Sequence, residues 1–79
     1  MTLDYIKKST LDVPEGIYFT YNGKQCGMDV EVKNYVWNFF VWCGKKTKNY
    51  PNFDEMANDK FFDGKSLAEL VDIVDINFG

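Results

Sequence analysis

Residues 16–43 read GIYFTYNGKQCGMDVEVKNYVWNFFVWC, and this stretch decides the fold. Asn22-Gly23 lies between two runs in which apolar and polar side chains alternate. Such a pair is the strongest local signal for a two-residue hairpin, because both central residues of a type I′ turn need positive φ. The turn pairs Tyr21 with Lys24, Phe19 with Cys26, Ile17 with Met28 and, on the other face, Tyr18 with Gly27.

A second tight turn is expected at Lys33-Asn34, which extends the hairpin into a three-stranded antiparallel meander over about 16–21, 25–32 and 35–43. The pairs across this turn are all apolar: Val32 with Tyr35, Val30 with Trp37, Met28 with Phe39 and Cys26 with Val41. Side chains alternate with period two, so a slip of one residue would turn every one of them to the opposite face. We therefore expect this register.

The two faces of the meander differ in character. One face is continuously apolar and is the expected core: Ile17, Phe19, Tyr21, Cys26, Met28, Val30, Val32, Tyr35, Trp37, Phe39, Val41 and Cys43. The opposite face should be polar, yet it also carries Tyr18, Val36, Phe40 and Trp42. In the expected register Tyr18, Gly27 and Phe40 line up, with Trp42 diagonal to the glycine.

Two interpretations of these four side chains remain open. The N-terminal segment could fold over this side and bury them with Leu3, Ile6, Leu11 and Val13. Otherwise they form an exposed aromatic patch, which marks an interaction surface because Trp and Tyr are frequent binding anchors. Residues 1–13 do not decide between the two, although Thr2 could cap a short helix there.

The second half of the chain predicts short helices that complete an α+β fold. Asn52 with Glu55 has the form of a capping box and predicts a helix over about 53–60, whose buried side is Phe53, Met56 and Ala57. Ser66 with Glu69 repeats the pattern and predicts a helix over about 66–74 with an apolar stripe at Leu67, Leu70, Val71 and Val74. Residues 44–51 are expected to be a lysine-rich loop, and residues 75–78 could add a short strand along an edge of the meander.

Size and composition indicate one domain spanning residues 1–79, folding as a monomer or a homodimer. Neither a secretion signal nor an apolar run of membrane-spanning length is visible, so we expect a cytoplasmic protein with no membrane contact and reduced cysteines. In the expected register Cys43 is the diagonal neighbour of Cys26 at about 7 to 8 Å, which is too far for a comfortable disulfide. Both cysteines are then core residues.

The composition argues against an enzyme. There is no histidine, so a tetrahedral zinc site, a cysteine nucleophile with its base and a serine triad all lack a component. Gly64-Lys65-Ser66 ahead of a helix has the end of a phosphate-binding loop, but Asp59 occupies the position of that motif's first glycine. We expect no catalytic residue, no cofactor and no metal.

Charge is distributed unevenly along the chain, whose net charge is −3. Residues 51–79 hold seven acids and two lysines, whereas residues 1–50 hold seven lysines and five acids. One alternative function is therefore an acidic inhibitor of a nucleic-acid enzyme that presents Asp54, Asp59, Asp63, Asp72 and Asp75. A single-strand nucleic-acid binder is another, since aromatic side chains on a sheet can stack bases, but the acidity and the absence of arginine disfavour it.

Residues 62–70, FDGKSLAEL, followed by Val74-Asp75-Ile76, resemble a segment that recurs in small uncharacterised proteins of Gram-positive bacteria and their phages or conjugative elements. The resemblance covers under a quarter of the chain. It implies a mobile-element origin and a helix cap, and it transfers no functional residue. The function that the sequence favours is a protein-interaction module that binds a protein partner through the outer aromatic face or a sheet edge.

Overall fold

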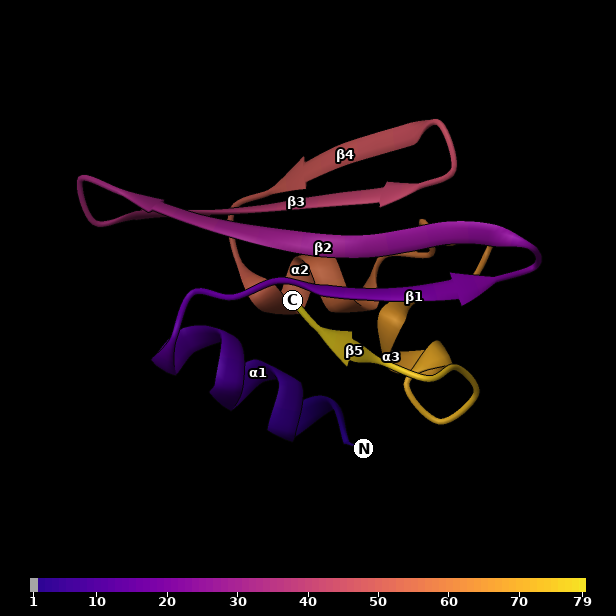
Figure 1. Cartoon of the computed structure of the whole chain (residues 1–79). Coiled ribbons are helices and arrows are strands. Elements are labelled where there is room, and N and C mark those ends of the chain that lie inside the picture. Colours follow the sequence, from indigo (N-terminus) through magenta and orange to yellow (C-terminus); the bar gives the residue numbers. More distant parts are fainter. Residues whose placement is uncertain (1) are drawn as a thin grey trace.

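The computed structural model describes residues 2–79 and shows an α+β fold in which three short helices lie on one side of a five-stranded antiparallel sheet (Figure 1). The strand order is β4-β3-β2-β1-β5. The α+β class is confirmed, and the sheet has two strands more than the predicted meander. The elements are α1 (Leu3–Asp12), β1 (Ile17–Tyr21), β2 (Lys24–Lys33), β3 (Val36–Cys43), β4 (Lys46–Tyr50), α2 (Phe53–Asn58), α3 (Leu67–Leu70) and β5 (Asn77–Phe78).

The N-terminal segment forms a helix on the core side of the sheet. Thr2 caps α1, and its hydroxyl accepts a hydrogen bond from the backbone N–H of Tyr5 at 3.2 Å. Ile6 is fully buried in the same core cluster as the side chains of α2 and α3. The interpretation that residues 1–13 cover the outer face is therefore wrong, because α1 lies on the opposite side of the sheet (Figure 1).

The first hairpin has the predicted register. Asn22 and Gly23 have φ values of 52° and 73°, as a type I′ turn requires. The pairs between β1 and β2 are those read from the sequence, including Tyr18 with Gly27.

The second hairpin turns one residue later than predicted, which shifts the pairing of β2 with β3 by two residues. Asn34 and Tyr35 occupy the two central positions of the turn, with φ values of 52° and 65°. Asn34 therefore takes the first of these positions, where asparagine tolerates a positive φ well. The pairs are now Lys33 with Val36, Val32 with Trp37, Val30 with Phe39, Met28 with Val41 and Cys26 with Cys43. Because the shift is even, each strand residue keeps its predicted face, and only Tyr35 leaves the core face for the turn, where it is 99% exposed.

Two strands flank this meander. The segment 44–51, expected to be a loop, contains β4. This strand pairs with β3, from Cys43 opposite Lys46 to Phe39 opposite Tyr50. Of its core-side residues only Tyr50 is apolar, so no alternation pattern marked it as a strand. The predicted final strand is confirmed in part. Strand β5 pairs with β1 at the opposite edge, with Ile17 opposite Phe78 and Tyr18 opposite Asn77.

Both predicted helices begin where their caps placed them, and both end early. The Asn52 side chain accepts from the Glu55 N–H at 2.8 Å, and Phe53, Met56 and Ala57 are buried as expected. Ser66 and Glu69 form a complete capping box. The predicted extensions to residues 60 and 74 are wrong, because the chain leaves α2 in extended conformation at Asp59 and turns after α3 to reach the β1 edge.

The core lies between the sheet and the helices. Phe39, Phe62, Met28 and Leu67 are among its fully buried side chains. No helix in residues 2–79 is long and apolar enough to cross a membrane.

Candidate functional site

The face of the sheet opposite the helices, called here the outer face, is not covered by any helix of the described chain (Figure 1). Tyr18 is 50% exposed and Val36 is 66% exposed, while Phe40 and Trp42 are half-buried. The polar members of this face are Thr20, Gln25, Asp29, Glu31, Lys33, Asn38, Thr47, Asn49 and Asn77. The outer face therefore presents large aromatic side chains among short polar ones.

The shifted register changes the arrangement of the four predicted binding residues. Trp42, and not Phe40, lies in one row with Gly27 and Tyr18. A Cβ atom at Gly27 would overlap the Trp42 ring, so the indole lies directly on the glycine. Phe40 is paired with Asp29, and its ring centroid is 6.2 Å from that of Trp42. The structure thus brings three of the four together.

Val36 lies apart from this group, at the end of the β2–β3 hairpin. Strands β1 and β4 pair only as far as Met28 and Phe39, so the residues beyond them form a two-stranded arm that projects from the sheet (Figure 1). Tyr35 at its tip and Val36 beside it are strongly exposed. The arm is a second exposed apolar surface that the sequence did not separate from the first.

A cavity of about 430 Å³ opens on the outer face between strands β5, β1, β2 and β3. Tyr18, Asp29 and Trp42 are among its lining residues, together with the polar side chains of Thr20 and Gln25. We call it the outer groove. Asp29 was not singled out from the sequence, because alternation alone marks it as one of several solvated polar residues, and only the three-dimensional neighbourhood sets it beside the rings.

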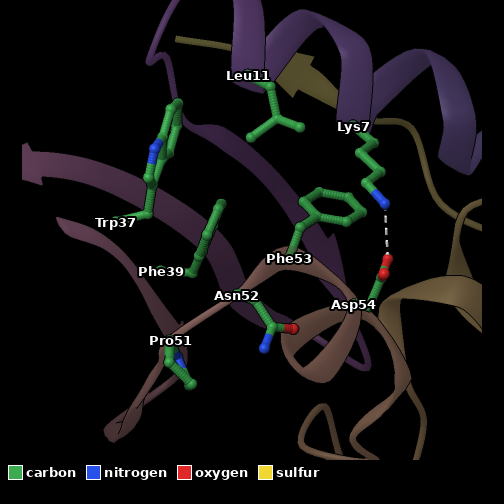
Figure 2. Close-up of a pocket in the computed structure, with 8 residues that line it drawn as sticks. All are labelled: Lys7, Leu11, Trp37, Phe39, Pro51, Asn52, Phe53 and Asp54. Atoms are coloured by element: carbon green, nitrogen blue, oxygen red, sulfur yellow. Dashed lines mark hydrogen bonds and ion pairs between the residues drawn. The ribbon is translucent and has the colours of Figure 1, made fainter. Parts of the chain in front are cut away.

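A second cavity, of about 250 Å³, lies between α1, β3 and the start of α2 (Figure 2). Its walls are mainly apolar. Leu11 on α1 faces Trp37 and Phe53, and the Trp37 and Phe39 rings are stacked with their centroids 6.1 Å apart. Its two charged groups, Lys7 and Asp54, pair with each other at 3.0 Å. The cavity therefore offers no unpaired charge that would orient a polar ligand.

The acidic half of the chain is compensated by lysines when the chain folds. Three ion pairs join the two halves: Lys7–Asp54 at 3.0 Å, Lys24–Asp63 at 2.7 Å and Lys48–Asp59 at 2.9 Å. The pKa of Asp59 is lowered chiefly by a hydrogen bond from the Tyr50 hydroxyl and then by one from Lys48. Three of the five carboxylates expected to form an acidic surface therefore already have a cationic partner.

The two cysteines meet across β2 and β3. Their Sγ atoms are 2.8 Å apart, and both side chains are buried. Burial, together with the hydrogen bond to Cys43, raises the pKa of the Cys26 thiol to about 12. The expectation that the cysteines lie diagonally and out of disulfide range is wrong, because the two-residue shift makes them direct partners.

Among residues 2–79, no three Cys, Asp or Glu side chains lie close enough together to hold a metal ion. Comparison of the chain with protein-family models, curated proteins and solved structures found no match.

Proposed function

We propose that this chain is a small cytoplasmic protein-interaction module, not an enzyme, that binds a protein partner through the outer face of its sheet. The observation that supports the proposal is that the helices of residues 2–79 pack on one face (Figure 1), while Tyr18, Phe40 and Trp42 gather on the other. Aromatic side chains of this kind are the residues that most often anchor protein interfaces. The proposed origin in a mobile element rests on the resemblance of residues 62–70 alone.

The sheet edges support binding less well. One edge is β4, which carries Lys46 and Lys48, and lysines on an edge strand discourage pairing with another strand. The other edge is covered in part by β5, which pairs with Ile17 and Tyr18. The face is therefore favoured over the edge as the binding surface.

The other two candidate functions have weaker support. An acidic inhibitor would need the carboxylates of residues 51–79, and three of these already pair with lysines. A single-strand nucleic-acid binder would stack bases on the outer aromatic rings, but Asp29 and Glu31 lie on that same face and would repel the phosphates.

Site-specific photo-crosslinking tests the proposal in cells that produce the chain. A photoreactive phenylalanine analogue replaces Tyr18 or Val36 on the outer face. Ile73 serves as the control because it is as exposed as Val36, at 66%, and lies in the turn that follows α3 rather than on a strand. We expect a discrete protein adduct from position 18 or 36 and none from position 73. The adduct partner, once purified, should bind the unmodified chain and lose affinity for a Trp42→Ser variant.

Adducts from position 73 alone, or no adduct from either outer-face position, would overturn the proposal. Binding of the purified partner with undiminished affinity to the Trp42→Ser variant would do the same.

A further inference from the structure

The outer groove is lined by aromatic side chains from two strands, Tyr18 of β1 and Trp42 of β3. The Trp42 indole lies on Gly27, and the Tyr18 ring on the neighbouring strand leans toward the chain end, where a Cβ at Gly79 would come within 2.8 Å of it. Both rings line the cavity of about 430 Å³. This volume is in the range of pockets that hold a ligand or a side chain.

A carboxylate that forms no ion pair within residues 2–79 lies beside these rings. Asp29 is the next outer-face residue of β2 after Gly27, and it is directly opposite Phe40. Its carboxylate lies against Gly16, which also lines the groove. None of the ion pairs formed within residues 2–79 includes Asp29 or the neighbouring outer-face acid, Glu31.

No lysine lines the outer groove. The lysines that form ion pairs do so with carboxylates of residues 51–79. Lys33 lies on the outer face, but it is the next outer-face residue of β2 after Glu31 and two such positions beyond Asp29, outside the groove. The groove is therefore both aromatic and acidic. A cation is attracted by ring faces and by carboxylates alike, whereas an anion is repelled by the carboxylates.

We propose that the outer groove binds a cationic side chain, a lysine or arginine presented by an extended basic segment of a protein partner. This inference rests on the proposed function and names the chemistry of the partner. The cation lies between the Tyr18 and Trp42 rings with its charge against Asp29, and Glu31 attracts the next basic residue of the same segment. The same charges exclude a nucleic-acid backbone from the groove.

A titration of the uniformly ¹⁵N-labelled chain tests the inference by NMR. The probe is a synthetic peptide of alternating glycine and lysine, with matched peptides in which arginine or glutamate replaces lysine. The chain has two indole N–H groups, and Trp37 lies on the core face, so its signal is an internal reference for that of Trp42. We expect the lysine and arginine peptides to shift the Trp42 signal, and the glutamate peptide to leave it unchanged.

Two single-charge variants separate the groove from general attraction. Asp29→Asn should weaken binding of the lysine peptide about three- to five-fold, as for the loss of one exposed ion pair. Asp72→Asn removes the same charge from an exposed carboxylate outside the groove that forms no ion pair within residues 2–79, and it should leave the affinity unchanged. Equal weakening by both variants would show non-specific charge attraction and overturn the inference.

Other outcomes are equally decisive. A shift of the Trp42 signal by a single-stranded oligonucleotide, with none by the basic peptides, would assign the groove to nucleic acid and refute a basic protein segment. Outer-face crosslinks to a protein without binding of the basic peptides would keep the proposed function and refute the cationic site. Absence of both would refute the two proposals together.

Discussion

Formation of a disulfide between Cys26 and Cys43 tests the pairing of β2 with β3 on which the outer face depends. In a glutathione redox buffer, two successive thiol–disulfide exchanges with one oxidised glutathione join the two sulfur atoms and release two reduced glutathione molecules. The paired thiols are 2.8 Å apart, so closure requires no movement of the strands. The pair occupies a non-hydrogen-bonded position, since the Gly44 N–H donates to the Gln25 carbonyl at 2.9 Å just beyond it.

The size of the effect follows from the loop that the bond closes. The cysteines are 17 positions apart, and constraining a loop of this length in the unfolded chain stabilises the native state by about 3 kcal/mol. For a domain of this size that corresponds to a rise in Tm of roughly 10 °C or more. A non-hydrogen-bonded pair has Cα atoms about 4.5 Å apart, which is within disulfide range, so little strain opposes the gain.

Intact-mass spectrometry measures closure as the loss of two hydrogen atoms, and thermal unfolding of the reduced and oxidised forms measures stability. Closure should be slow in the native protein, because burial raises the pKa of Cys26 to about 12 and leaves little thiolate. Mild denaturant should accelerate it.

A cysteine-swap variant provides the matched control. In the register first predicted from the sequence, Cys26 faces position 41, so Val41→Cys combined with Cys43→Val would restore a facing pair there. In the structure, position 41 faces Met28, and this variant should close much more slowly than the wild type. If the variant closes readily while the wild type stays reduced, the pairing of β2 with β3 described here is wrong.

Three further predictions concern stability. Thr10 is fully buried, and its hydroxyl has no hydrogen-bond partner within the described residues. Thr10→Val should therefore raise the free energy of unfolding, measured by urea titration, by about 1 kcal/mol. A decrease would mean that the hydroxyl has a partner. Gly27→Ala should destabilise the fold by about 1 to 3 kcal/mol, because the added Cβ overlaps the Trp42 ring and lies 2.6 Å from the Ile17 carbonyl oxygen. A variant as stable as the wild type would show that the indole does not lie on the glycine. The pKa of Glu69 is lowered to about 2, first by the hydrogen bond from Lys60 and then by the one from the Ser66 N–H. The stabilisation of the folded state by the ionised Glu69 is therefore complete above pH 4.5 and is lost as the pH falls toward 2. Urea titrations across this range should show a smaller loss for Glu69→Gln than for the wild type, and an equal loss would contradict the assignment.

The faces of the sheet could be predicted from the sequence, whereas one register could not. Alternation places each residue on a face, and a shift of two residues leaves that placement unchanged. The predicted pair Cys26–Val41 and the observed pair Cys26–Cys43 are equally apolar. The two registers differ in the turn: in the observed one Asn34 takes the first positive-φ position, where asparagine is favoured in type I′ turns.

Elements held by tertiary contacts were harder to predict than those with local signals. The caps at Asn52 and Ser66 marked both helix starts correctly. Strand β4 escaped detection because Lys48 occupies a core-side position, where it pairs with Asp59 and lies over the Tyr50 ring at 5.2 Å. Phe62 is fully buried against Phe19 in a non-helical turn that no periodicity reveals.

The candidate site was predicted in composition and not in arrangement. Tyr18, Phe40 and Trp42 were recognised as anomalous on a face that should be polar. Their grouping around Asp29 depends on the shifted register, which moved Trp42 onto Gly27 and set Phe40 opposite the acid.

The central claim, that the outer face is an uncovered surface, is tested most directly by the solvent accessibility of its rings. A soluble paramagnetic agent enhances the relaxation of exposed ring protons. Phe39, which is 1% exposed on the core face, is the internal reference for a ring that the agent does not reach. We expect the strongest enhancement at Tyr18, clear enhancement at Phe40 and Trp42, and none at Phe39, at every protein concentration tested. Protection of Tyr18 and Trp42 equal to that of Phe39 in dilute solution would contradict the account.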